Sequence, residues 1–252
     1  MGNSRTVLIT GAARRIGRAL ALDLAGLGWQ VGLHCGSSVD EAQNLAAKIV
    51  ASGGKAAVLP ANLSDIEAVE ALVSRCVSAL GAPSCLINNA ATFHEDTLSS
   101  LAPDTWDHQL AVNLKAPIFL AKHFAKHLPQ GVTGNVINII DQRVLRPTPE
   151  LFSYAVSKCG LWAATRMLAQ ALAPRVRVNA IGPGPVLKST LQTDDEFRRE
   201  YEATLLVRGS SPEEIAAAVR FILDAPAMTG QMIALDGGQH LSWHDPYAGS
   251  RK

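Results

Sequence analysis

The fold is decided by one stretch of sequence, TGAARRIGR at residues 10–18. It follows the apolar, β-branched run Thr6–Thr10 and opens the stretch Ile16–Leu27, whose apolar residues recur at helical spacing. Gly11 permits a sharp turn, and Gly17 permits close approach of the backbone. The helix N-terminus then offers unpaired N–H groups and a partial positive charge, which suit a pyrophosphate. Taken alone, the turn also fits an ordinary strand-to-helix connection with basic side chains in water.

Strand-like and helix-like stretches alternate along the rest of the chain. We expect strands at Thr6–Thr10, Gln30–His34, Ala56–Pro60, Cys85–Asn88, Asn135–Ile140, Arg177–Ala180 and Met232–Leu235. We expect helices at Ile16–Leu27, Asp40–Ala51, Asp65–Ala79, Pro103–His127, Phe152–Ala173 and Pro212–Asp224. The strands are solid apolar runs, as in sheets that helices cover on both faces. The sequence therefore predicts a single α/β domain over residues 1–252, built on a doubly wound, mostly parallel seven-stranded sheet.

Composition excludes several classes of function. The chain has 252 residues, of which 48% are apolar, and its 23 basic residues nearly balance 22 acidic ones, so no positive field exists to hold a nucleic acid. No apolar run approaches the roughly 18 residues of a membrane helix, and the first strand begins at about Arg5, which leaves no room for a signal peptide. Cysteines and histidines lack metal-ligand spacing. We expect a cytoplasmic protein with a small-molecule substrate and no metal.

The end of the second strand indicates which dinucleotide the turn accepts. An acid about 20 residues beyond the turn would bind a ribose 2′-hydroxyl, but the chain reads HCGSS at residues 34–38, with no carboxylate before Asp40. Arg14 and Arg15 lie in the turn, and Ser37 and Ser38 offer hydroxyls to a phosphate. NADP is therefore favoured over NAD. The serines also fit the N-cap of the helix that begins near Asp40.

A second constellation, Tyr154 and Lys158, lies one helical turn apart on the same face of the helix Phe152–Ala173. Tyrosine normally titrates near 10, and an ammonium held nearby would stabilise the phenolate. The pair then becomes a proton donor or acceptor at neutral pH. A tyrosine and a lysine four residues apart on a helix are otherwise ordinary surface residues.

Taken in order, these motifs resemble the classical short-chain dehydrogenase/reductase family from roughly Arg5 to Leu241. The matching residues are the glycine turn, Asn88-Asn89-Ala90, Asn113, Tyr154 with Lys158, Pro183-Gly184 and Asp236-Gly237-Gly238. The resemblance implies a Rossmann-type fold, homotetramers, Tyr154 as proton donor, Lys158 on the nicotinamide ribose and Asn113 supporting a proton-relay water. The candidate NADP(H)-binding residues are Gly11, Arg14, Arg15, Ile16, Gly17, His34, Ser37, Ser38, Asn62, Leu63, Asn89, Ala90, Tyr154, Lys158, Pro183 and Gly184.

Three departures from the family's commonest pattern resemble the pteridine reductase branch, which includes dihydromonapterin reductases. Arg15 stands where most members have glycine, Asp141 where most have a catalytic serine, and Phe93 follows the Asn-Asn-Ala motif. In that branch the arginine bridges cofactor phosphate and pterin, the aromatic residue stacks on the pterin, and the aspartate partners the tyrosine. We therefore assign Asp141, Tyr154, Lys158 and Asn113 to catalysis, and Arg15, Phe93, Asp141 and Tyr154 to substrate binding.

Elementary chemistry supports the role of Asp141. A serine donates a hydrogen bond to a developing alkoxide, whereas an ionised carboxylate only accepts hydrogen bonds. A pterin presents amino and ring N–H donors, and reduction of its C=N bond needs a proton on nitrogen. Plainer interpretations are that Asp141 caps a turn or pairs with Arg143, that Phe93 is core, and that Arg15 contacts only a 2′-phosphate.

The leading hypothesis is an NADPH-dependent reductase of a dihydropterin, with residues 182–209 as a lid over the substrate. A short-chain ketone or 3-oxoacyl reductase is the alternative enzyme. A non-catalytic NADP-binding sensor and a scaffold without ligand are alternatives from other classes. Both leave the joint presence of Tyr154, Lys158 and Asn113 unexplained.

Overall fold

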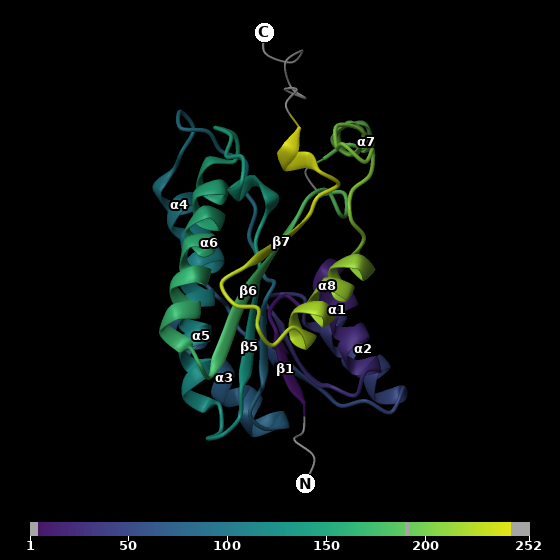
Figure 1. The fold of residues 1–252 in the computed structure, drawn as a ribbon, viewed down its shortest axis with the longest axis vertical. Coiled ribbons are helices and arrows are strands. Elements are labelled where there is room, and N and C mark those ends of the chain that lie inside the picture. Colours follow the sequence, from purple (N-terminus) through teal and green to yellow (C-terminus); the bar gives the residue numbers. More distant parts are fainter. Residues whose placement is uncertain (1–4, 190–191, 243–252) are drawn as a thin grey trace.

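The computed structural model describes residues 5–189 and 192–242 of the 252. Within these ranges seven parallel strands form one sheet in the order β3-β2-β1-β4-β5-β6-β7. The strands are β1 Thr6–Ile9, β2 Gln30–Cys35, β3 Ala56–Pro60, β4 Cys85–Asn88, β5 Gly134–Ile139, β6 Val176–Pro183 and β7 Met232–Leu235. The doubly wound parallel sheet predicted from the sequence is confirmed (Figure 1).

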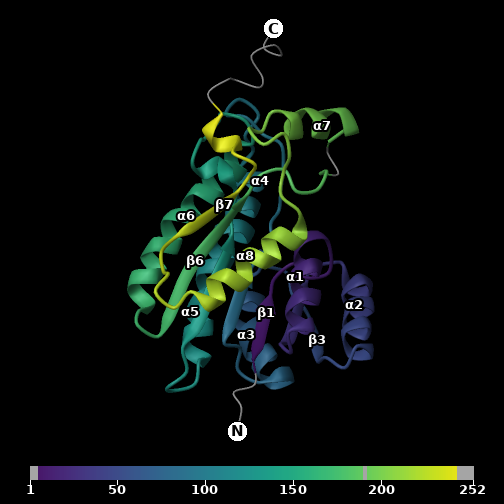
Figure 2. The same cartoon turned by 45° about the vertical axis from the view of Figure 1, so that its right-hand side comes forward.

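Helices cover both faces of this sheet. They are α1 Arg15–Gly26, α2 Val39–Ala51, α3 Ile66–Leu80, α4 Pro103–Leu110, α5 Ala116–His127, α6 Phe152–Leu172, α7 Asp194–Glu202 and α8 Pro212–Asp224. Figures 1 and 2 show α1, α2 and α8 on one face, α3 to α6 on the other, and α7 beyond the carboxyl ends of the strands. No helix among the described residues is long and apolar enough to cross a membrane.

The core has two layers, because successive residues of a strand point to opposite faces of the sheet. In β1, Val7 and Ile9 pack with α1 and α8, whereas Leu8 packs with α3 and α5. All three are fully buried. Burial of such a side chain stabilises the fold by about 1.5–3 kcal/mol, which explains why both neighbours in each strand are apolar.

Most predicted boundaries agree with the structure to within one residue, and two predicted elements differ by more. The single helix expected at Pro103–His127 is interrupted by a π-helical turn, Ala111–Lys115, between α4 and α5. Apolar periodicity does not reveal one extra residue in a turn, and such turns occur often at functional sites. Strand β6 continues past the predicted end at Ala180 to Pro183, because Ile181 to Pro183 pair with β7.

The order of the strands reverses between β1 and β4, which lie side by side in the sheet. Connections leave this point in opposite directions, so a crevice opens beyond the carboxyl ends of the two strands. Ligands of doubly wound sheets bind at such a crevice. The loops that follow β1 and β4 are therefore where the site is built.

Candidate functional site

Thr10 fastens the loops after β1 and β4 to each other. Its Oγ1 accepts hydrogen bonds from the backbone N–H groups of Asn89, at 2.9 Å, and Ala90, at 3.0 Å. In return, Nδ2 of Asn89 donates to the carbonyl oxygens of Thr10 and Gly11, at 2.9 and 3.1 Å. From the sequence, Thr10 was expected only as the end of a strand and the first residue of the glycine turn. The hydroxyl at the end of the strand beside the crevice was the signal for this role.

Glycine is required at both ends of the turn. Gly11 has φ of 63°, and a Cβ atom there would lie 2.9 Å from Cα of Ala90. A Cβ atom on Gly17 would lie 2.1 Å from the carbonyl oxygen of Gly11. Either clash would push the first turn of α1 away from β4. The two glycines therefore keep an open cradle at the N-terminus of α1.

Arg15 adopts a backbone conformation that arginine rarely takes. Its φ is 53°, in the left-handed region, where a non-glycine residue costs of order 1–3 kcal/mol. Its guanidinium donates to the carbonyl oxygens of Leu187 and Lys188, both at 2.7 Å. Burial, and then the neighbouring charge of Arg14, lower the pKa of Arg15. In this structure Arg15 therefore connects the glycine turn to the segment after β6.

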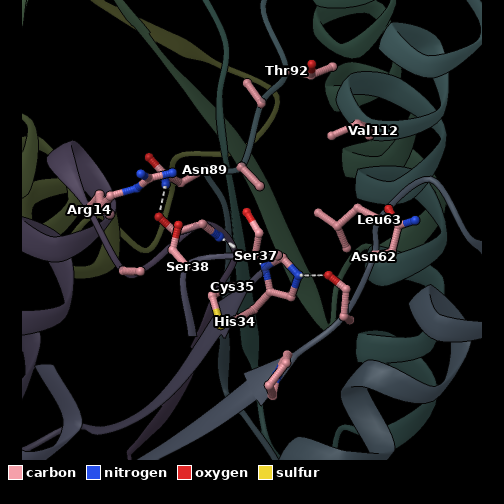
Figure 3. A pocket seen from close by; sticks show the side chains of 18 of the residues that line it. Arg14, His34, Cys35, Ser37, Ser38, Asn62, Leu63, Asn89, Thr92 and Val112 are labelled. Atoms are coloured by element: carbon pink, nitrogen blue, oxygen red, sulfur yellow. Dashed lines mark hydrogen bonds between the residues drawn. The ribbon is translucent and has the colours of Figure 1, made fainter. Parts of the chain in front are cut away.

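A cavity of about 930 Å³ lies in the crevice (Figure 3). Twelve of the candidate cofactor residues line it: Gly11, Arg14, Arg15, Ile16, Gly17, His34, Ser37, Ser38, Asn62, Leu63, Asn89 and Ala90. Nine further lining residues were not predicted: Ala13, Cys35, Gly36, Pro60, Ala61, Ala91, Thr92, His108 and Val112. Seven of them adjoin candidate cofactor residues in the same strands and loops, so their backbone neighbours were the available signal. The other two, His108 in α4 and Val112 in the π-helical turn, lie apart from those residues in the sequence and had no such signal. Tyr154, Lys158, Pro183 and Gly184 do not line this cavity.

Basic and hydroxyl groups lie on one side of the cavity. Figure 3 shows Arg14 and Ser38 on this side, across from Asn62 and Leu63. Arg14 is 3.8 Å from Glu41, and its side chain is 64% exposed, so it is not locked in an internal ion pair. Ser38 occupies the N-cap position of α2, but its side chain makes no capping hydrogen bond. Its hydroxyl therefore serves no helix cap in this structure.

His34 forms the floor of the cavity and links three strands. Its Nδ1 accepts from the backbone N–H of Gly11, and its Nε2 donates to the carbonyl oxygen of Ala61, each at 3.1 Å. Burial lowers the pKa of His34 to about 4, so the ring is neutral at pH 7. Both ring nitrogens are thus used by the protein's own backbone. The structure places this predicted cofactor residue as a support for the turn.

A buried tyrosine, a buried lysine and a partly buried aspartate lie together beyond β5. Tyr154 donates its hydroxyl hydrogen to Oδ2 of Asp141 at 3.0 Å. The other carboxylate oxygen of Asp141 accepts from the backbone N–H of Arg143 at 2.8 Å, which begins the short turn Gln142–Val144. Lys158 donates to the carbonyl oxygen of Ile139 at 3.0 Å. Asp141 therefore both caps a turn, as the plainer interpretation had it, and holds the tyrosine.

Electrostatics keep the hydroxyl of Tyr154 protonated. Burial, the charge of Asp141 and the hydrogen bond to it raise the pKa of Tyr154 well above its usual value. Burial also raises the pKa of Asp141, and it lowers the pKa of Lys158 to about 8. From the sequence, the ammonium of Lys158 was expected to stabilise the phenolate. In this structure the effect of Asp141 and of burial dominates, and the phenol stays protonated.

Asn113 and Phe93 lie next to Tyr154. Asn113, in the π-helical turn, accepts from the backbone N–H of Thr92 at 2.8 Å and donates to its carbonyl oxygen at 2.9 Å. It also donates to the hydroxyl of Ser157 at 3.1 Å. The ring of Phe93 is 4.8 Å from that of Tyr154 at an interplanar angle of 68°. Phe93 is 36% exposed, so it is not a core residue.

The last two candidate residues lie where β6 ends. Pro183 is the final residue of β6, and Gly184 follows it. A Cβ atom on Gly184 would lie 2.7 Å from Cα of Asp236, so the chain passes close to the end of β7 here. Among the described residues no group of three His, Cys, Asp or Glu side chains is placed to hold a metal ion.

Comparisons with known proteins fit this geometry. The family model described as "Enoyl-(Acyl carrier protein) reductase" matches residues 11–240. A 3-oxoacyl-[acyl-carrier-protein] reductase of Synechocystis is 31% identical, over 93% of this chain and 96% of that protein.

Solved structures give a second comparison. FolM Alternative dihydrofolate reductase 1 of Brucella canis, complexed with NADP, is 46% identical, with a TM-score of 0.91 over 97% of this chain and 98% of that one. A short-chain dehydrogenase/reductase of Serratia marcescens is 30% identical, with a TM-score of 0.88 over 94% of this chain and 98% of that one. On these matches and this fold, the chain belongs to the short-chain dehydrogenase/reductase family of oxidoreductases.

Proposed function

We propose that this chain is an NADPH-dependent reductase of a dihydropterin-type substrate. One observation carries the proposal: Tyr154 donates to Asp141 at 3.0 Å, where a ketone reductase would use a serine. The Brucella canis protein, at 46% identity, is named as an alternative dihydrofolate reductase, and dihydrofolate contains a dihydropterin ring. The carboxylate, rather than overall similarity to reductases, is the feature that selects the substrate class.

The cavity residues suit NADP(H). Gly11 and Gly17 leave the cradle that a Cβ atom would fill, and the N–H groups of the first turn of α1 would hold a pyrophosphate there. A 2′-phosphate would be held by Arg14, Ser37 and Ser38 on the cavity wall. The adenine would be held by Asn62 and Leu63. Lys158 would hold the nicotinamide ribose. When bound, NADPH supplies the hydride for the carbon of the C=N bond.

Asp141 and Tyr154 handle the proton. The carboxylate of Asp141 accepts hydrogen bonds from the amino and ring N–H groups of the pterin, for which an acceptor is the complementary group. Tyr154, whose pKa is raised, donates its proton to the ring nitrogen. Asn113 fixes the loop at Thr92 and supports the water that restores the proton to Tyr154.

Phe93 and Arg15 complete the substrate site. The exposed face of Phe93 offers a flat π-surface to a heteroaromatic ring next to the hydroxyl of Tyr154. Arg15, now bonded to carbonyl oxygens of the segment at residues 182–209, would close that segment over the pterin as a lid. Two lid residues, Thr190 and Leu191, lie outside the described residues.

A 3-oxoacyl or other ketone reductase is the second candidate, and the sequence relatives favour it. The Synechocystis relative is named as a 3-oxoacyl-[acyl-carrier-protein] reductase. In such a reaction the carbonyl oxygen becomes an oxyanion that needs donors. Asp141 would repel that charge, which leaves Tyr154 as the donor. A non-catalytic NADP-binding sensor would need neither residue.

Cellular location and assembly are parts of the same proposal. Family resemblance supports a homotetramer in the cytoplasm that acts on a small molecule and binds no nucleic acid. The near-balanced charge, +1 in total, agrees with the last point.

The decisive experiment compares kcat/KM for a dihydropterin and for a 3-oxoacyl substrate in the unchanged protein and in Asp141→Ser. Asp141→Ser should lower kcat/KM for the dihydropterin by about 5- to 200-fold, because a buried donor of the ring loses its acceptor. Phe93→Ala should weaken the binding of the dihydropterin. Arg15→Ala should weaken the binding of both the dihydropterin and NADPH. Better ketone reduction by Asp141→Ser, with no dihydropterin activity in the unchanged protein, would refute the assignment to pterins.

A further inference from the structure

Three buried polar side chains form a cluster behind Tyr154, outside the cavity and outside the candidate site. Asp96 lies in the loop after β4, Gln109 in α4, and Ser153 in the first turn of α6. Asp96 is 6% exposed, and the other two are fully buried. Buried polar groups of this kind are stable only when their hydrogen bonds are complete.

The hydrogen bonds of the cluster run in one direction. Gln109 donates from Nε2 to the hydroxyl oxygen of Ser153, and that hydroxyl donates to Oδ2 of Asp96. The backbone N–H of Ser153 donates to Oδ1 of Asp96 at 3.0 Å. The backbone N–H of His94 donates to Oε1 of Gln109 at 3.4 Å. The carboxylate of Asp96 is thus the terminal acceptor of the chain.

Asp96 replaces the missing cap of α6. Leu151 occupies the N-cap position with φ of 54° and gives no side-chain cap. Asp96 instead accepts from the Ser153 N–H through its carboxylate and from the Phe152 N–H through its carbonyl oxygen, at 3.0 and 3.2 Å. A carboxylate near a helix N-terminus is also favoured by the helix dipole. The first turn of α6 is therefore fixed by a residue from a different loop.

That turn and that loop carry the two residues that face the substrate. Tyr154 directly follows Ser153 in α6, and Phe93 precedes Asp96 by three residues in the loop. The rings of Phe93 and Tyr154 are in contact at 4.8 Å between centroids. A rotation of the first turn of α6 against the loop would separate the phenol from Asp141 and alter the angle between the two rings.

We propose that Asp96 is a positioning residue that holds Tyr154 and Phe93 in their reactive arrangement through Ser153 and Gln109. The inference rests on the proposed role of Tyr154 as proton donor, and not on the identity of the substrate. Asp96 contacts neither of the two substrate-facing side chains directly, so it acts through the cluster. Misplacement of a catalytic group by about 1 Å costs rate by as much as about 100-fold.

The direction of the hydrogen bonds allows a test in which the donors and acceptors of the cluster are exchanged. Asp96→Asn places an amide NH₂ against the hydroxyl of Ser153, which already receives a hydrogen bond from Gln109. The hydrogen of the Ser153 hydroxyl then has no acceptor. The double variant Asp96→Asn/Gln109→Glu reverses the chain, because the amide at position 96 donates to the hydroxyl and the carboxylate at position 109 accepts from it. Glu95→Gln, an exposed neighbour, removes a carboxylate from the same loop and serves as control.

The experiment measures kcat, KM, the dissociation constant for NADPH and the melting temperature of each variant. The substrate is whichever of the dihydropterin and the 3-oxoacyl compound the unchanged enzyme reduces, so failure of the pterin assignment leaves this test intact. Asp96→Asn should lower kcat by about 10- to 100-fold and keep the NADPH dissociation constant within about twofold. The double variant should recover most of the lost kcat, and Glu95→Gln should match the unchanged enzyme.

Two results would overturn the proposal. One is an unchanged kcat in Asp96→Asn; the other is a double variant that regains its melting temperature without regaining kcat, which would show a role in stability alone. Should Asp96→Asn fail to fold, Ser153→Ala takes its place, because it keeps the backbone cap to Asp96 and removes only the hydroxyl. It should show the same loss of kcat with unchanged NADPH binding, and full kcat in a folded Ser153→Ala would refute the proposal.

Discussion

The hydroxyl of Tyr154, a buried residue, donates to the carboxylate of the partly buried Asp141 across 3.0 Å. Asp141, an ionisable acceptor, therefore occupies the position at which most members of the family have a serine. Burial and the charge of Asp141 raise the pKa of Tyr154, so the phenol keeps its proton while the carboxylate accepts its hydrogen bond. This bond therefore sets the chemistry for which the site is suited.

Tyr154→Phe should abolish most turnover while leaving cofactor binding intact. The change keeps the ring that contacts Phe93 and removes the hydroxyl that donates to Asp141. We expect kcat to fall by about 10²- to 10⁴-fold, since general acid catalysis contributes about that much. Steady-state kinetics and NADPH titration measure the two effects. Normal turnover of the true substrate in this variant would move the proton donor to Asp141.

Affinity for NADPH should fall above about pH 8 because Lys158 loses its proton there. Burial lowers the pKa of Lys158 from 10.5 to about 8, so the ammonium that would hold the ribose is present below that pH and absent above it. Values of kcat/KM for NADPH, which report the free enzyme, should show this alkaline limb. In Lys158→Arg, whose guanidinium stays charged, the limb should disappear. A limb that stays near pH 8 in that variant would assign it to another group.

Acid should destabilise the folded chain through His34 in a defined range of pH. The pKa of His34 is lowered from 6.5 to about 4, so between these values the unfolded chain binds a proton that the folded chain does not. Stability is therefore complete above pH 6.5 and decreases as the pH falls toward 4. The difference amounts to about 3 kcal/mol. Urea unfolding at pH 7 and pH 5 should show a smaller loss in His34→Gln, whereas His94→Gln, at an exposed histidine, should keep the full loss.

NADPH should bind at least about tenfold more tightly than NADH, a difference of 1.4 kcal/mol. Arg14 lines the cavity beside Ser37 and Ser38, and among the described residues that line it there is no carboxylate to favour a free 2′-hydroxyl. Arg14→Ala should remove most of the preference by weakening NADPH binding alone. Arg18→Ala, at an exposed arginine of α1 that does not line the cavity, is the control. Fluorescence titration measures both cofactors, and equal affinities in the unchanged protein would contradict the assignment.

Much of this architecture can be predicted from the sequence because it depends on local rules. Solid apolar runs mark buried parallel strands, and helical periodicity marks the covering helices. The roles of Gly11 and Gly17 can be predicted because their positions require the absence of a side chain. The pairing of Asp141 with Tyr154 can be predicted because Asp141 lies 13 residues before Tyr154, where most members of the family have a serine. In the structure the two side chains are hydrogen-bonded.

Contacts between distant segments cannot be predicted in this way. Nothing near Arg15 in the sequence indicates that its guanidinium would reach Leu187 and Lys188, more than 170 residues later. Asp96 was passed over for the same reason, because its partners lie in two other helices. The π-helical turn at Ala111–Lys115 adds no apolar residue out of phase that a periodicity argument would detect.

The left-handed backbone at Arg15 changes what a sequence pattern for this family measures. Most members carry glycine at this position, and glycine adopts φ near 53° without strain, whereas arginine does not. A search that demanded glycine at residue 15 would pass over this chain, although Gly11 and Gly17 still close the turn. A glycine in such a pattern indicates only that the position needs a left-handed backbone conformation, which glycine adopts without strain. In this chain the strained conformation comes with a side chain that bridges to Leu187 and Lys188, a connection that glycine could not make.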